Sequence, residues 1–148
     1  MFVYLKTGGG HLAPARAILN YMNKHFSDKA EPQLIYGFEK TPRWVQFIIE
    51  DGYRILQYTG KWFFEFLYAL NKFSFAALIS CNLVAPFMSK YLEQVIVKEK
   101  PEKIVIFHIF CIIPVFRILK KHNLSIPVLT VITDPFTPHP MWFLKKNQ

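Results

Sequence analysis

The chain has 148 residues, a formal net charge of +8, 52% hydrophobic residues and 17% aromatic residues. That length suits a single domain with its own core. The positive charge is spread along the chain without dense basic runs, which argues against a nucleic-acid binder. The composition favours a domain that meets a membrane surface, and a basic globular domain whose charge serves solubility is the plain alternative.

The first informative feature is a glycine-rich turn. An apolar run at residues 2–5 leads into Thr-Gly-Gly-Gly-His at residues 7–11, and a helical pattern follows. This order predicts a strand, a turn and a helix. Glycine lets a ligand approach the backbone, and the unpaired N–H groups at a helix start favour an anion. We therefore expect a phosphate or diphosphate site, with a mere tight corner as the alternative, at Thr7, Gly8, Gly9 and Gly10.

Known nucleotide motifs fit this turn poorly. It is neither the G-x-G-x-x-G of dinucleotide-binding folds nor a P-loop, and Lys6 precedes the glycines instead of following them. A nucleoside-triphosphatase is therefore disfavoured.

The next elements alternate between helix and strand. Apolar residues recur at helical spacing over residues 15–26, and residues 33–38 predict a second strand after Pro32. A helical period continues from residue 44 to residue 55, where Gly52 and Gly60 mark weak points or ends.

Two further helices are strongly apolar. Residues 62–70 are apolar almost all round, and residues 83–98 carry a clear apolar stripe. We expect these stripes to pack in the core. Docking onto lipid is the alternative for residues 62–70, because they mix Trp, Phe and Tyr with flanking lysines. The uncharged stretch 73–89 contains Asn82 and Pro86 and is too short for a membrane span, so we expect only surface contact.

The last part of the chain predicts two buried strands, at residues 103–107 and 128–133, separated by a helix at residues 111–122. Strands that alternate with helices indicate an α/β fold with a parallel sheet. With no repeat or linker, we expect one domain over residues 1–148.

Polar residues follow the predicted strands where each strand ends. His11 follows the first strand, His108 ends the third, and Thr133 with Asp134 ends the fourth, shortly before His139. Ligands of open α/β sheets bind at the carboxyl ends of the strands. The sequence therefore predicts an active-site edge.

Each of these residues also has a purely structural alternative. His108 could be a core histidine bonded to backbone, Asp134 could cap a turn before Pro135, and His139 could lie in an exposed loop between prolines.

The histidines and the two cysteines, Cys81 and Cys111, lack metal-ligand spacing, so we expect no metal and no cofactor. Both cysteines lie among apolar residues and predict buried thiols in a reducing compartment. Because Met1 opens almost directly onto the first strand, we expect no secretory leader.

These motifs together resemble the monogalactosyldiacylglycerol synthases and the bacterial processive diacylglycerol glucosyltransferases. The resemblance rests on the glycine turn with Ala15-Arg-Ala-Ile18, on residues 100–108, and on residues 127–143 with their T-D…H-P-x-W-F pattern. It covers roughly half the chain. Gly37 and Phe38 stand where the family usually has an acidic residue, and Ile109 stands where it often has proline.

The resemblance implies a Rossmann-like parallel sheet flanked by helices, forming the N-terminal half of a glycosyltransferase B fold. It implies a lipid-acceptor domain that touches an anionic membrane, peripherally and on the cytoplasmic face. The UDP-sugar would bind a C-terminal domain that we expect to be absent here, or a partner chain. The implied reaction is inverting transfer of a hexose to diacylglycerol or a related lipid in glycolipid biosynthesis, and we expect the chain to be inactive alone.

The resemblance also implies residue roles. His11 is the first candidate for the general base, because a neutral histidine suits that role. Asp134 would orient it or share its role. The glycine turn, with His108 beside it, would hold the acceptor or a phosphate, while His139 and Trp142 would line the lipid side, with Trp142 at the membrane interface.

Two alternatives to this interpretation remain. One is the acceptor half of a glycosyltransferase acting on a polyprenyl-diphosphate lipid. The other is a non-catalytic membrane-binding fragment.

Overall fold

The computed structural model describes residues 1–7, 10–134 and 138–143. Gly8 and Gly9, expected in the phosphate site, lie outside the described residues. The elements follow the predicted alternation of strands and helices: β1 (Phe2–Tyr4), α1 (Leu12–His25), β2 (Leu34–Tyr36), α2 (Arg43–Gln46), π-helix η1 (Phe47–Asp51), α3 (Gly52–Thr59), α4 (Lys61–Leu70), α5 (Ser74–Glu99), β3 (Ile104–Ile106), 3-10 helix η2 (Ile109–Cys111), α6 (Ile112–Lys121), β4 (Val128–Thr130) and 3-10 helix η3 (Pro140–Phe143).

The strands form a parallel sheet in the order β2-β1-β3-β4, as the sequence predicts. Phe2 pairs with Leu34 on one side and with Val105 on the other, so β1 lies in the middle of the sheet. Both β1 and β3 are buried throughout. Their continuous apolar runs are typical of strands with helices on both faces.

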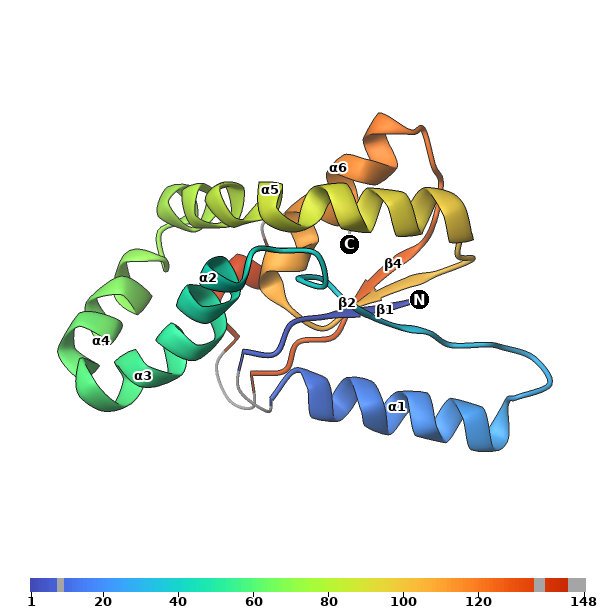
Figure 1. The fold of residues 1–148 in the computed structure, drawn as a ribbon, viewed down its shortest axis with the longest axis horizontal. Helices are drawn as coiled ribbons and strands as arrows, with labels where there is room; N and C mark the ends of the chain where they lie inside the picture. Colours follow the sequence, from blue (N-terminus) through green and yellow to red (C-terminus); the bar gives the residue numbers. More distant parts are fainter. Residues whose placement is uncertain (8–9, 135–137, 144–148) are drawn as a thin grey trace.

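Helices cover both faces of this sheet, so the domain has three layers: helix, sheet and helix. Figure 1 shows α1 along one face and α5 with α6 along the other. Met88, Leu92 and Ile96 lie on one stripe of α5 and are fully buried against the sheet. Most of the apolar stripe predicted for residues 83–98 therefore packs in the core, because residues four apart share one helix face. Cys81 and Cys111 are buried thiols, and burial raises the pKa of Cys81 to about 12.

Helix α5 is longer than the sequence predicts. It begins at Ser74, not near residue 83, and runs through Pro86. By length and composition, its span Phe75–Glu99 would suffice to cross a membrane, with 28% of its most apolar window buried. Such a helix is weak evidence for a span, since core helices pass the same test. Ala85, Met88 and Leu92 are buried and tie α5 to the rest of the domain.

A helical insertion, which we define as residues 43–73, projects from one end of the sheet (Figure 1). Here the expectation of core packing is wrong. Trp44 is 61% exposed, Trp62 is 76% exposed and Phe66 is 58% exposed. The helices do form, and Gly60 does separate α3 from α4, but large apolar side chains on them lie outside the core, since none of the described elements covers them. Gly52 marks the boundary at which the π-helix η1 ends and α3 begins, in agreement with the prediction of a weak point or an end.

The strand order places a topological switch point between β1 and β3. The chain leaves β1 through α1 toward β2, then returns through the helical insertion and α5 to β3 on the other side of β1. Such a point opens a crevice at the carboxyl ends of the two strands, where doubly wound folds bind ligands.

Candidate functional site

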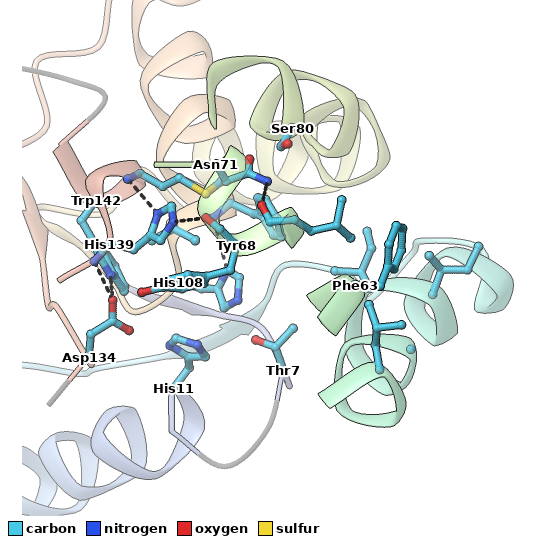
Figure 2. Close-up of a pocket in the computed structure, with 18 of the residues that line it drawn as sticks. Thr7, His11, Phe63, Tyr68, Asn71, Ser80, His108, Asp134, His139 and Trp142 are labelled. Atoms are coloured by element: carbon cyan, nitrogen blue, oxygen red, sulfur yellow. Dashed lines mark hydrogen bonds between the residues drawn. The ribbon is translucent and has the colours of Figure 1, made fainter. Parts of the chain in front are cut away.

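A cavity of about 600 Å³ lies at this switch point. One wall is the sheet edge with Thr7, His11 and His108. The opposite wall comes from the helical insertion and is mainly apolar, with Phe47, Ile48, Leu56, Phe63 and Leu67. Figure 2 shows the labelled residues of both walls around the cavity. A polar sheet edge that faces an apolar wall suits an amphipathic ligand with a small polar head and an apolar body.

His11 lies at the centre of the polar wall. Its Nδ1 lies 2.7 Å from the hydroxyl of Thr133, and its ring meets the ring of His108 edge-on with the ring centroids 4.4 Å apart. Burial lowers the pKa of His11, and a hydrogen bond with the Phe107 carbonyl and the charge of Asp134 oppose that effect. His11 is therefore a neutral imidazole near pH 7, the protonation state that a general base needs.

His108 has one nitrogen fixed by the backbone. The N–H of Phe110 donates to His108 Nδ1 at 3.2 Å and begins η2, so the ring proton of the neutral form belongs on Nε2. Burial holds the pKa of His108 well below its usual range, and the neighbouring His11 lowers it further. His108 thus offers a cavity ligand a hydrogen-bond donor, not a base.

Asp134 holds the last turn of the described chain in place. Its Oδ2 accepts hydrogen bonds from the backbone N–H of His139 at 3.0 Å and from Trp142 Nε1 at 2.8 Å. No hydrogen bond between Asp134 and His11 occurs within the described ranges, so the carboxylate acts on His11 through charge alone. Trp142 is 1% exposed, so the expectation that it lies at a membrane interface is wrong.

His139 is buried and is not the exposed loop residue of the structural alternative. Its Nδ1 accepts from the N–H of Met141 at 3.2 Å, and its Nε2 lies 3.4 Å from the Tyr68 carbonyl. The Tyr68 ring also meets the His139 ring edge-on, with centroids 4.7 Å apart. His139 therefore joins α4 of the helical insertion to the sheet edge, and both of its ring nitrogens are engaged in doing so.

The glycine turn meets the cavity through Thr7. Thr7 is only 8% exposed, and its hydroxyl has no hydrogen-bond partner among the described residues. Gly10 has open space where a Cβ would stand. Helix α1 begins just beyond, with no side chain capping its first turn. An unpaired hydroxyl beside uncapped N–H groups leaves donors for an oxygen-rich ligand.

Two residues that the sequence analysis did not assign to the site support it. Glu50 accepts hydrogen bonds from the backbone N–H of Lys6 and from the Tyr36 hydroxyl, both at 2.7 Å, which ties η1 to the start of the glycine turn. Thr133 is the hydrogen-bond partner of His11. Thr133 stood at a predicted strand end, and Glu50 followed three apolar residues and preceded Asp51. Neither signal reveals a partner far away in the sequence.

No cluster of three or more His, Cys, Asp or Glu side chains suited to a metal ion occurs in the part of the chain that the structure describes. The polar side chains that line the cavity among the described residues are imidazoles, hydroxyls, the Asn71 amide and the Asp134 carboxylate, which is already engaged with the backbone and Trp142. Their arrangement favours hydrogen bonding and proton transfer at a ligand hydroxyl.

The fold and the site define an α/β domain with a histidine-lined crevice beside an apolar wall. Comparison with known proteins identifies the family to which this domain belongs. The model of the family described as "Monogalactosyldiacylglycerol (MGDG) synthase" matches residues 11–148. The chain therefore belongs to the MGDG synthase family.

Curated relatives point to the same family. The chain is 28% identical to a "Probable monogalactosyldiacylglycerol synthase, chloroplastic" of Nicotiana tabacum, with 94% of this chain and 26% of the relative covered. It is 32% identical to "Monogalactosyldiacylglycerol synthase 2, chloroplastic" of Arabidopsis thaliana, with 93% and 30% covered. The chain thus spans between a quarter and a third of the length of these relatives. No solved structure gives a significant match.

Proposed function

We propose that this chain is the acceptor-binding domain of a membrane-associated glycosyltransferase that moves a hexose from a UDP-sugar to diacylglycerol or a related lipid. The observation that carries this proposal is the cavity in which neutral His11 and His108 face an apolar wall. Family membership supports the reaction type, since the relatives are named as monogalactosyldiacylglycerol synthases.

In the proposed reaction, the lipid hydroxyl attacks the anomeric carbon of the sugar. The new bond joins the lipid oxygen to that carbon, the bond from that carbon to the diphosphate oxygen breaks, and UDP leaves with the bonding electrons. His11 takes the proton of the hydroxyl. His108 donates from Nε2 to the same lipid oxygen and holds it beside His11, while the acyl chains lie along Phe63 and Leu67.

Exposed aromatic residues of the helical insertion support the proposal of membrane contact. Trp62, Phe66 and Phe73 are exposed there, beside the basic residues Lys61 and Lys72. Aromatic side chains with flanking cations are typical of segments that lie in a membrane interface and are attracted to anionic lipids. We propose a peripheral position on the cytoplasmic face, with the lipid entering the cavity from the membrane.

The UDP-sugar would bind a further domain of the same protein or a partner chain. The residues that line the cavity supply a lipid-sized apolar wall and hydroxyl-binding groups, and they fit an acceptor better than a nucleotide.

The test is sugar transfer on vesicles that contain diacylglycerol. Labelled UDP-galactose or UDP-glucose is supplied to this chain alone and to the chain joined to the C-terminal region of a relative. We expect activity in the joined form, its loss in His11→Ala, and its retention in His25→Ala, where the exposed histidine lies at the far end of α1. Near-normal turnover of His11→Ala would remove His11 from the mechanism.

If vesicles bind but diacylglycerol is never glycosylated, a polyprenyl-diphosphate acceptor becomes the better candidate. Competition between the two lipids in the same assay separates them.

A further inference from the structure

The partner of His11 is a hydroxyl, although a carboxylate lies nearby. Asp134 is the residue directly after Thr133, yet its Oδ2 is engaged by the N–H of His139 and the indole of Trp142. Among the described residues, the side-chain hydrogen bond at His11 Nδ1 is made instead with the Thr133 hydroxyl, across 122 positions of sequence.

We propose that Thr133 is the positioning residue of His11, holding its imidazole in one orientation through both gain and loss of a proton. The role of His11 as a base rests on the proposed function, whereas its contact with Thr133 is observed in the structure. With Nδ1 occupied by Thr133, a base takes its proton at Nε2, so Nδ1 carries a hydrogen in both charge states. The Thr133 hydroxyl oxygen accepts from Nδ1–H in both states and can therefore keep this hydrogen bond as His11 changes charge.

The choice of a hydroxyl has an electrostatic consequence. A carboxylate at the same place would favour the imidazolium form strongly, whereas a neutral oxygen favours it only weakly. The other titratable groups that face His11 are His108, whose neutral ring adds no charge, and Asp134, whose charge acts without a hydrogen bond. Thr133 thus fixes the ring and leaves it neutral, which keeps it ready to accept a proton.

The chain segment before Thr133 provides a matched control. Thr130, the last residue of β4, has a buried hydroxyl with no hydrogen-bond partner in the described part of the chain. Thr130→Val and Thr133→Val make the same chemical change on the same segment, and only the second removes a hydrogen bond to His11.

The experiment measures the pKa and tautomer ratio of His11 by ¹⁵N and ¹³C NMR in the chain as given, without substrate. We expect Thr133→Val to lower the pKa of His11 further and to shift its tautomer ratio, because the hydrogen bond is stronger with the charged ring. Thr133→Ser and Thr130→Val should leave both unchanged, and Thr133→Asp should raise the pKa.

Each outcome decides the proposal. Unchanged His11 signals in Thr133→Val overturn it. Equal shifts in Thr133→Ser and Thr133→Val also overturn it, because Ser keeps the hydroxyl that Val removes, and the hydroxyl then cannot be the cause. In the joined enzyme, Thr133→Val should lower kcat at least tenfold with little change in KM, and Thr133→Ser should restore it. Absent transfer by the unsubstituted enzyme would count against the proposed function, while the NMR result would still decide the role of Thr133.

Discussion

Trp62 provides the sharpest test of how the domain meets a membrane. Its side chain lies on α4 and is 76% exposed, with a ring contact to Phe63 at 5.7 Å between centroids. Water-exposed tryptophan is unfavourable unless a partner or a bilayer covers it. We therefore expect Trp62→Ala to weaken vesicle binding while leaving the fold intact.

The magnitude follows from the exposed area. A tryptophan offers at most about 250 Å² for burial, so 76% exposure leaves roughly 190 Å² in water. If half of that enters the interface, about 25 cal/mol per Å² gives between about 2 and 3 kcal/mol. That free energy corresponds to a loss of affinity of roughly 50-fold.

The assay is sedimentation with vesicles of phosphatidylcholine and phosphatidylglycerol over a range of lipid concentrations. The control is Tyr21→Ala, because Tyr21 is 59% exposed on α1, which covers the face of the sheet opposite to α5 (Figure 1). Equal affinity of Trp62→Ala and the unsubstituted chain, or an equal loss in Tyr21→Ala, would refute the assignment of the helical insertion as the membrane surface.

Three further predictions concern stability. Asp134→Leu removes an acceptor of two hydrogen bonds and should lower the free energy of unfolding by about 3 kcal/mol, measured by urea titration. Asp134→Asn should lower it by less. An unchanged urea midpoint in Asp134→Leu would contradict this role. Burial lowers the pKa of His108, so below about pH 6.5 the unfolded chain binds a proton that the folded chain does not bind. The free energy of unfolding, which is full above that pH, should therefore fall by up to about 1.4 kcal/mol per pH unit as the medium is acidified. His108→Asn should flatten this pH dependence, and an equally steep curve would exclude His108 as its source. Glu50→Gln should weaken the link between η1 and the glycine turn by about 1 kcal/mol, seen as faster hydrogen exchange at the Lys6 amide, while exchange in α6 serves as the unaffected reference.

Much of the architecture was predictable from local sequence. Apolar β-type runs such as residues 103–107 favour strands buried on both faces, and their alternation with helices predicts a parallel sheet. Because parallel strands share one carboxyl edge, the sequence also predicts that His11, His108 and Asp134 line the same crevice, and all three do.

The partners within that crevice were not predictable. Asp134 was expected to orient His11, but the neighbouring Thr133 occupies that place and Asp134 binds Trp142. The two residues are adjacent in sequence, and only the exact direction of the chain after β4 decides which of them reaches the imidazole.

Periodicity also fails to say what covers an apolar helix face. The helix predicted at residues 83–98 and that at residues 62–70 are both strongly apolar in sequence, and both were expected to pack in the core, yet Met88 is fully buried while Trp62 is exposed. Burial depends on whether another layer lies against that face, which is a property of the assembled fold. The sequence by itself thus determined the order of strands and helices and the polar edge of the sheet, since these follow from local pattern. The buried strand predicted at residues 128–133 was wrong in its extent and burial, because β4 ends at Thr130 at the edge of the sheet, with Leu129 55% exposed. Tertiary structure alone decided the hydrogen-bond partners and the exposed aromatic surface, since these depend on groups brought together from distant parts of the chain.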